Sequence, residues 1–350
     1  MSTEPFTING VAVKPGTRTT IDLPAGRLYT HAPMTIPVHV VAGKRAGPCL
    51  FLSAAIHGDE INGVEIIRRV LKLPVLKRLK GTVLAVPIVN IHGLISHSRY
   101  LPDRRDLNRS FPGTEKGSLA ARLAHLFMTE IVAKSTHGID LHTGAIHRSN
   151  LPQIRANLDD DETNRMARAF QAPVIISSNL RDGSLRESAS EFGIPTLLYE
   201  AGEALRFDEV GIRAGVKGIV NVMRLLGMLP ASRTVPKRQT DPVVARSSSW
   251  VRAPSSGILR AMVPLGGRVK NGTLLGIVAD PFGEREAEIT ATFSGIIIGR
   301  TNLPLVNEGD ALYHIARFED IEEIEAKVDE FQEEHSPEPI SATHSESPII

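Results

Sequence analysis

The stretch CLFLSAAIHGDEINGVEIIRR, residues 49–69, contains a buried strand, a polar turn and the start of a helix. Its first eight residues form a near-continuous apolar run, which is typical of a strand covered on both faces of a sheet. From Ile61 onward, apolar residues recur every third position, which predicts an amphipathic helix that ends before Pro74. His57 and Glu60 stand together at the turn. A buried strand that leads directly into a helix indicates an α/β fold.

The same alternation continues along the chain. Short apolar runs predict further strands at residues 81–90, 136–144, 172–178 and 194–202. Longer periodic segments predict helices at residues 118–134 and 210–229. Before this region, residues 1–48 hold short alternating segments between turn residues, which favours antiparallel strands. We therefore predict a mixed sheet with helices on both faces, in a three-layer α/β arrangement.

The composition changes near residue 230. Residues 232–249 are polar and contain proline, so we predict a linker between a catalytic domain at 1–231 and a second domain at 250–317. The last part, 318–350, begins as an acidic helix and ends in a segment with too few apolar residues to pack, which favours disorder.

The predicted second domain contains two similar segments. SSGILRAMVPLGGRVKNGTLL (255–275) matches FSGIIIGRTNLPLVNEGDAL (293–312) in its Ser-Gly-Ile start and its late glycine turn. Two similar β units of this size predict a small all-β sandwich or barrel. The domain resembles the biotinyl/lipoyl carrier fold. However, the turn DPFGEREAE (280–288), where a carrier would present its modified lysine, contains no lysine.

Composition and charge limit the possible partners. The 350 residues include 40 basic and 39 acidic side chains, a net charge of +1, which gives no reason to expect nucleic acid or an anionic membrane. The single cysteine, Cys49, allows no internal disulfide, as suits a reducing compartment. The first residues lack the pattern of a signal peptide, and no apolar run is long enough to cross a bilayer. We expect a cytoplasmic protein.

His57, Glu60 and His142 are the candidate metal ligands. His142 lies in GIDLHTG (138–144), again at the end of a predicted strand, where ligand sites of α/β sheets collect. Catalytic zinc takes nitrogen and oxygen ligands, usually three from the protein plus water. Asp140 could orient the imidazole of His142. Two alternatives stay open at this point: Glu60 would also suit the first turn of a helix, and His147 is a rival third ligand.

The loop SRYLPDRRDLNRSFPGT, residues 98–114, is rich in arginine. Arginine clusters are usually solvated, but here the arginines alternate with Tyr100, Leu101, Leu107 and Phe111, which indicates a partly packed loop. A packed arginine presents a planar fork that matches a carboxylate. The loop therefore predicts recognition of a carboxylate.

The chain contains, in this order, the motifs HGDE, SRY, DLNRSFPG, DLHTG and YEAG. This series of motifs resembles the succinylglutamate desuccinylase and aspartoacylase family. These are zinc hydrolases related to the metallocarboxypeptidases. The resemblance covers roughly residues 45–230. It implies a zinc-carboxypeptidase-like fold with one Zn²⁺ per chain, bound by His57, Glu60 and His142. It also implies that Arg99 polarises the carbonyl of the bond to be cleaved.

The resemblance assigns further roles by motif. Asn108 and Arg109 of DLNR would bind the carboxylate of the substrate. Glu200, at the end of the strand before YEAGE, would be the general base, with Glu203 as its rival. Because Glu200 follows an apolar strand, we expect its carboxylate to be partly desolvated. A strand end also fixes its position best.

These features predict a zinc-dependent amidohydrolase that acts on carbon–nitrogen bonds, other than peptide bonds, in linear amides. Its partner would be a small molecule, an N-acyl amino acid or a related carboxylate-bearing substrate. One alternative is a metallocarboxypeptidase acting on short or acidic peptides. Another is a non-catalytic ligand-binding or carrier protein. The β domain could also mediate a homo-oligomer.

Overall fold

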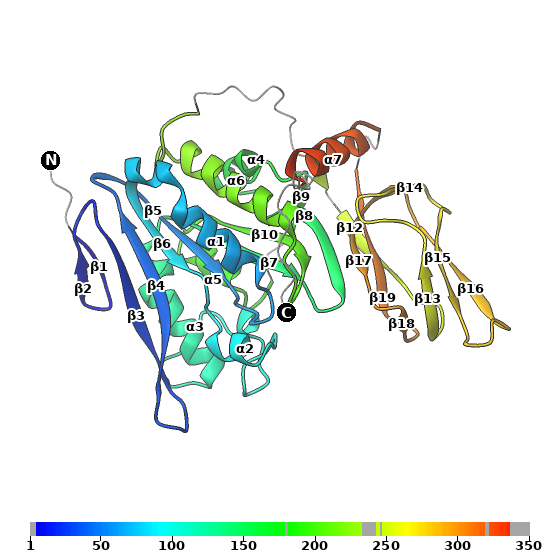
Figure 1. Ribbon diagram of the computed structural model, residues 1–350, viewed down its shortest axis with the longest axis horizontal. Coiled ribbons are helices and arrows are strands. Elements are labelled where there is room, and N and C mark those ends of the chain that lie inside the picture. Colours follow the sequence, from blue (N-terminus) through cyan, green and yellow to red (C-terminus); the bar gives the residue numbers. More distant parts are fainter. Residues whose placement is uncertain (1–4, 179–180, 233–242, 246, 319–321, 337–350) are drawn as a thin grey trace, which may run out of the picture.

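The computed structural model describes residues 5–178, 181–232, 243–245, 247–318 and 322–336 (Figure 1). Its helices are α1 (Asn62–Lys72), α2 (Ile91–Ile95), α3 (Leu119–Glu130), α4 (Asp161–Phe170), α5 (Leu185–Glu191), α6 (Glu209–Leu225) and α7 (Glu322–His335), with 3₁₀ turns at Pro74–Arg78, Leu107–Arg109 and Val132–Lys134. Within the described residues, no helix is both long and apolar enough to span a bilayer.

The strands are β1 (Phe6–Ile8), β2 (Val11–Val13), β3 (Arg18–Arg27), β4 (Pro33–Ala42), β5 (Arg45–Ala54), β6 (Lys80–Val86), β7 (His137–Gly144), β8 (Arg148–Ala156), β9 (Val174–Ser177), β10 (Thr196–Glu203), β11 (Val243–Ala245), β12 (Ser247–Arg252), β13 (Gly257–Ala261), β14 (Arg268–Val269), β15 (Leu274–Ala279), β16 (Glu286–Thr290), β17 (Gly295–Thr301), β18 (Leu305–Val306) and β19 (Ala311–Arg317). Three sheets contain them: β1 with β2, a central sheet of 13 strands, and a separate sheet in the order β16-β15-β13-β18.

The central sheet is mixed, as predicted. Its main path is β12-β19-β17-β8-β10-β7-β5-β6-β4-β3. Strands β6, β5, β7 and β10 run parallel to one another, whereas β4, β8 and β17 pair antiparallel. The carboxyl ends of β5, β7 and β10 therefore meet at one edge of the sheet, where ligand sites of α/β proteins form.

Helices cover both faces of this sheet (Figure 1). Leu50, Leu52 and Ala54 of β5 pack in one apolar cluster with residues of α1, α4 and α6. Phe51, on the opposite face of the same strand, packs in a second cluster with residues of α3 and α5. Successive side chains of a strand point to opposite faces of the sheet, so neighbouring residues of β5 pack in different clusters. The predicted three-layer α/β fold with a small additional antiparallel sheet is confirmed.

A glycine lets α1 lie directly on the two strands that carry the histidines. A Cβ atom on Gly63 would lie 2.6 Å from Cβ of Ala54 in β5 and 2.7 Å from Cβ of Leu141 in β7. Such distances leave no room for a methyl group. The turn before α1 is thereby held close to the end of β7.

The C-terminal strands join the central sheet instead of standing apart from it. β17 pairs with β8, and β19 and β12 follow β17, so one layer of the predicted β domain extends the main sheet. The second layer is the four-stranded sheet, and an apolar cluster lies between the two. The boundaries at 1–231 and 250–317 stay predictions.

The last part of the predicted linker at 232–249 contains strand segments. Val243–Ala245 form β11, which pairs in parallel with β9, and β12 begins at Ser247. Residues 243–245 pair here because a short strand can extend the exposed edge of β9. The rest of the linker, 233–242, and the predicted tail, 337–350, lie outside the described residues. The acidic helix α7 contacts α6 through an ion pair of 2.6 Å between Lys217 and Glu334.

Arg69 of α1 pairs with Glu65 of the same helix and with Glu209 of α6, at 2.7 Å each. The second ion pair links α1 to α6. Hydrogen bonds from Arg68 and Arg69 lower the pKa of Glu65 from 4.5 to about 2. A lowered pKa in the folded state means that the pairing stabilises the protein above pH 4.5. This contribution is lost as the pH falls from 4.5 towards 2.

We therefore expect Glu65→Gln to lower the free energy of unfolding at pH 7 by about 1 kcal/mol. The difference from the unmodified protein should shrink steadily between pH 5 and pH 3, as measured by urea unfolding. Lys72→Ala, at the exposed end of the same helix, is the control and should have a small, pH-independent effect. A Glu65→Gln difference that stays constant down to pH 3 would contradict this account.

Candidate functional site

The HGDE turn packs tightly between β5 and α2. A Cβ atom on Gly58 would lie 2.0 Å from the backbone carbon of Gly93, so only glycine fits there. The tight turn directs the side chains of His57 and Glu60 inward, where they are 4% and 2% exposed. Within the described residues no side chain caps α1, and Glu60 stands before its N-cap residue, Ile61, outside the first turn. Glu60 therefore serves the cluster described next and not the helix start.

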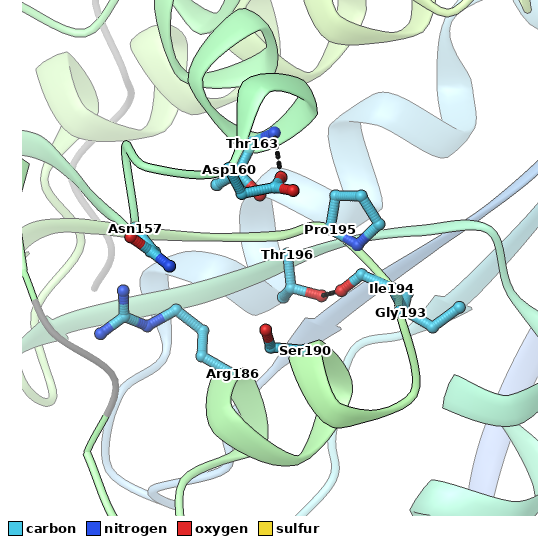
Figure 2. Close-up of a pocket in the computed structure, with 9 residues that line it drawn as sticks. All are labelled: Asn157, Asp160, Thr163, Arg186, Ser190, Gly193, Ile194, Pro195 and Thr196. Carbon is cyan, nitrogen blue, oxygen red and sulfur yellow. Dashed lines mark hydrogen bonds between the residues drawn. The ribbon is translucent and has the colours of Figure 1, made fainter.

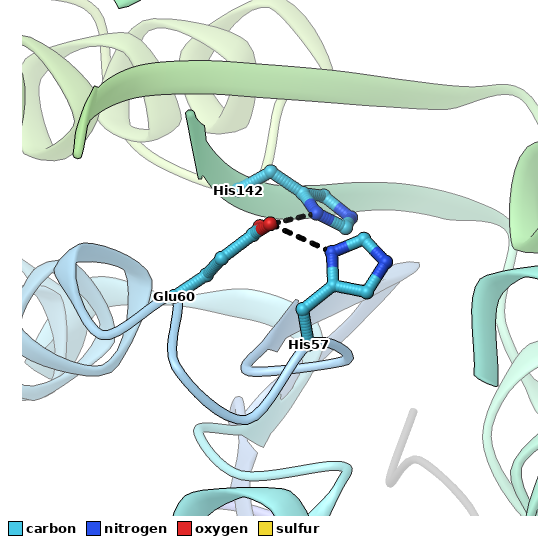
Figure 3. Close-up of side chains that lie close together, drawn as sticks. All are labelled: His57, Glu60 and His142. Atoms are coloured by element: carbon cyan, nitrogen blue, oxygen red, sulfur yellow. Dashed lines mark hydrogen bonds and ion pairs between the residues drawn. The ribbon is translucent and has the colours of Figure 1, made fainter. Parts of the chain in front are cut away.

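His57, Glu60 and His142 converge at the carboxyl edge of the sheet (Figure 3). Oε1 of Glu60 lies 2.8 Å from Nδ1 of His57, and Oε2 lies 2.7 Å from Nδ1 of His142. The ligand atoms of the three residues all lie within 4.8 Å of one another. Residues distant in the sequence thus present two nitrogens and a carboxylate to one point.

Further carboxylates hold the outer nitrogens of both imidazoles. Nε2 of His57 lies 3.1 Å from Oδ1 of Asp106. Nε2 of His142 lies 2.7 Å from Oδ2 of Asp140, whose other oxygen accepts a hydrogen bond of 2.7 Å from Ser53. This is the contact expected of Asp140 if it orients the imidazole of His142. Metal-binding histidines commonly donate their second N–H to a carboxylate in this way.

This arrangement fits a divalent cation. A neutral imidazole can donate one hydrogen bond, yet each buried ring here has a carboxylate at both nitrogens. If Nε2 donates outward, each Nδ1 presents a lone pair towards the same point as Glu60. Two nitrogens, one carboxylate and room for water make up a common donor set of catalytic zinc.

The charges of the cluster shift its pKa values strongly. Burial lowers the pKa of His57 and His142, but the neighbouring carboxylates outweigh burial and raise both pKa values above the ordinary one. Burial would raise the pKa of Glu60, but the two histidines bring it well below its usual range. The carboxylate is therefore ionised, and the site favours positive charge.

Arg99 lies beside the cluster. Its Nη1 is 3.2 Å from Oε1 of Glu60, and its Nη2 donates to Oδ2 of Asp106 at 3.0 Å. Sequence analysis did not single out Asp106, although it stands directly before Leu-Asn-Arg in the same motif. Burial would raise the pKa of Asp106, but His57 and Arg99 hold it well below its usual range. Asp106 thus connects the arginine loop to the candidate metal ligand.

Asn108 and Arg109 face the same cavity, and α5 holds their loop in place. Oδ1 of the buried Asn108 accepts a hydrogen bond of 2.9 Å from the backbone N–H of Leu185. Its amide nitrogen is therefore the end available for a ligand. Burial, followed by the charges of Arg181 and Arg99, lowers the pKa of Arg109. A negative ligand would relieve this repulsion.

The cavity between these side chains has a volume of about 460 Å³. His57, Glu60 and His142 line it, as do Asn108 and Glu200. Six arginines also line it: Arg99, Arg109, Arg148, Arg155, Arg181 and Arg186. Arg104 and Arg105 of the predicted cluster are exposed at the surface instead. The excess of guanidinium groups favours an anionic ligand.

Glu200 enters the cavity from β10, beside His142 of β7 in the sheet register. Among the described residues, its polar contacts all fall on one oxygen, Oε2. Asn150 donates to it at 2.8 Å and Gln153 at 3.3 Å, and Nε of Arg155 lies 3.2 Å away. The side chain is 17% exposed, in agreement with the expected partial desolvation. Oε1 is the oxygen left for a reaction.

Strand β8 supplies these three partners, and sequence analysis assigned no strand there. Glu200 pairs with Gln153 and Gly202 pairs with Asn150, so β8 contains one extra residue between the two pairs. Pro152 lies in this bulge, where a strand tolerates proline. The bulge brings Asn150 and Gln153 to the same side, although they are three residues apart.

The rival residues lie elsewhere. Glu203 accepts hydrogen bonds from the backbone of His147 at 3.0 Å and from Asn302 at 2.8 Å. The side chain of His147 is 52% exposed. Neither Glu203 nor His147 belongs to the residues that line the cavity. The geometry therefore favours His142 as the third ligand and Glu200 as the base.

Trp250 and His314 form the wall contributed by the C-terminal strands. Their rings stack with centroids 4.6 Å apart and an angle of 9°. The guanidinium of Arg148 lies 5.1 Å from the centroid of the Trp250 ring. All three residues line the cavity. The C-terminal part of the chain is thus part of the site.

A smaller cavity of about 80 Å³ (Figure 2) shares one lining residue, Arg186, with the larger one. Two of its polar side chains already have partners: Asp160 accepts a hydrogen bond from the backbone of Thr163 at 2.7 Å, and Thr196 donates to the carbonyl of Ile194 at 3.0 Å. The volume is too small for an amino-acid derivative. The larger cavity is therefore the candidate site.

Comparisons with known proteins agree with this geometry. A model of the family described as the succinylglutamate desuccinylase/aspartoacylase catalytic domain matches residues 46–226. The N-alpha-acetyl-L-2,4-diaminobutyric acid deacetylase of Halomonas elongata is 30% identical over 292 residues, which are 80% of this chain and 85% of that protein.

Solved structures share the fold. A succinylglutamate desuccinylase/aspartoacylase from Rhodobacter sphaeroides has a TM-score of 0.77 at 24% identity, over 86% of this chain and 96% of that chain. The product-bound ectoine utilization protein EutE (DoeB) from Ruegeria pomeroyi has a TM-score of 0.78 at 23% identity, over 90% of this chain and 99% of that one. The resemblance predicted from the motifs is confirmed: the chain belongs to the succinylglutamate desuccinylase/aspartoacylase family, whose members are deacylases.

Proposed function

We propose that this protein is a zinc-dependent deacylase that hydrolyses the amide bond of an N-acyl amino acid. One observation carries the proposal: His57, Glu60 and His142 converge in the same cavity as Glu200. A zinc ion held by the three residues would supply Lewis acidity towards water and towards a carbonyl oxygen. The separate metallocarboxypeptidase and carrier hypotheses receive less support, because the relative from Halomonas elongata is a deacetylase.

The other polar residues divide the work of binding and proton transfer. The amide nitrogen of Asn108 and the guanidinium of Arg109 would bind the carboxylate of the substrate. Arg99 would stabilise the negative charge that develops on the carbonyl oxygen. Oε1 of Glu200 would take a proton from the attacking water and pass it to the leaving amine as the carbon–nitrogen bond breaks.

The first substrates to test follow from the relatives and from the cavity. N-alpha-acetyl-L-2,4-diaminobutyrate is included because the curated relative is named for its deacetylation. Acidic substrates, such as N-acetyl-L-aspartate and N-succinyl-L-glutamate, are included because six arginines line the cavity. Short acidic peptides test the carboxypeptidase alternative. A chain that cleaved only the peptides would contradict the deacylase proposal.

Two substitutions separate metal binding from proton transfer. We expect His57→Ala to lose bound zinc and activity together, because two ligands hold the ion much more weakly than three. We expect Glu200→Gln to retain one zinc per chain but to lose at least about a hundredfold in kcat. Metal analysis of purified protein and initial rates on the substrate panel measure both. Undiminished turnover by Glu200→Gln would contradict its assignment as the base.

Asp106→Asn tests the carboxylate that holds the outer nitrogen of His57. We expect zinc affinity to fall about tenfold, because a weaker partner at Nε2 orients the imidazole less firmly and makes it less basic. Competition with a coloured chelator measures the dissociation constant. Asp103→Asn, in the same loop but paired with Arg105, is the matched control and should bind zinc normally. Equal affinity of both variants would contradict this role for Asp106.

A further inference from the structure

The side-chain amide of Asn150 lies between Glu200 and the C-terminal strands. Its Nδ2 donates to Oε2 of Glu200 at 2.8 Å, and the side chain is buried. An ionised carboxylate only accepts hydrogen bonds, so the amide must turn its nitrogen towards Glu200. Its oxygen, Oδ1, then faces the other side.

Gly299 of β17 occupies that other side. It pairs with Asn150 in the sheet register. A Cβ atom at residue 299 would lie 2.9 Å from Oδ1 of Asn150, 3.2 Å from Cβ of His314 and 3.5 Å from Cη2 of Trp250. The contact with Asn150 is the shortest of the three and involves the end of a side chain, so a methyl group would displace the amide. The conformation of residue 299 does not itself require glycine.

The wall behind the amide cannot give way easily. Trp250 and His314 stack on each other, and Arg148 lies over the indole ring. Stacked aromatic rings and a cation over a ring face favour fixed relative positions. The hydroxyl of Ser248 also lies 2.9 Å from Nε2 of His314. The amide of Asn150 is therefore confined on the side away from Glu200.

We propose that the C-terminal strands position the general base: Gly299 and the Trp250–His314 wall confine the amide of Asn150, which holds Oε2 of Glu200 so that Oε1 faces the reacting atoms. Asn150 and Gly299 are positioning residues in this account, because each acts through Glu200. The inference rests on the proposed function of Glu200 as the base. It gives the C-terminal strands a part in catalysis beyond limiting the size of the cavity.

Gly299→Ala and Asn150→Ala test the proposal in the full-length, zinc-loaded protein, with the panel substrate that it cleaves fastest. We expect kcat to fall at least about tenfold in each, because misplacing a catalytic group by ~1 Å can cost about a hundredfold. KM should change less than about twofold, since the residues that bind the substrate are untouched. Zinc content should stay at the level of the unmodified protein.

Asn302→Ala is the matched control. Asn302 follows β17 and holds the C-terminal strands to the rest of the chain through Glu203 and Ser149, but it does not contact Asn150. We expect its kcat and KM to equal those of the unmodified protein. A fall in kcat as large as that of Gly299→Ala would show that loosened docking, and not the position of the amide, causes the effect, and would overturn the proposal.

A double-mutant cycle distinguishes positioning from general damage. If the substitutions act through Glu200, adding either to Glu200→Gln should cause no further loss of the residual rate. A further tenfold loss in that background would overturn the inference, as would a normal kcat for both single variants. Asn150→Ala carries the test if Gly299→Ala does not fold. An active Glu200→Gln variant would instead overturn the proposed function on which the inference rests.

Discussion

The carboxylate of Glu60 connects the parts of the candidate site. Its two oxygens face His57, three residues earlier in a turn, and His142, at the end of another strand. Burying a carboxylate away from water is costly unless charges or hydrogen bonds compensate. The parallel pairing of β5 with β7 and the close approach of α1 at Gly63 place that compensation within reach. The fold and the candidate metal site therefore depend on the same contacts.

Around this carboxylate, charges of opposite sign alternate outward. Asp106 and Asp140 lie behind the two histidines, and Arg99 bridges Glu60 to Asp106. Glu200 is held separately, by β8 and through it by the C-terminal strands. The candidate ligands thus sit in a network of ion pairs, while the candidate base depends on contacts between two parts of the chain. This separation explains why substitutions near the base and near the ligands should have different effects.

Much of the site could be predicted from sequence because both candidate histidine ligands and the candidate base lie near the end of an apolar run. His57 follows β5, and His142 and Glu200 lie in the later parts of β7 and β10, strands whose burial is evident in the residues themselves. β8 could not be predicted in this way. Its polar side chains face a cavity instead of solvent, and Pro152 in its bulge interrupts the strand pattern. Asp106 carried no periodic signal either, because its position depends on the tertiary contact with His57.

The most direct test of the central claim is a crystal structure of the zinc-loaded protein, with anomalous diffraction measured on both sides of the zinc absorption edge. The account predicts one zinc peak per chain, bound by Nδ1 of His57, Nδ1 of His142 and the carboxylate of Glu60. A peak held by other side chains, or no peak at this edge of the sheet, would contradict it.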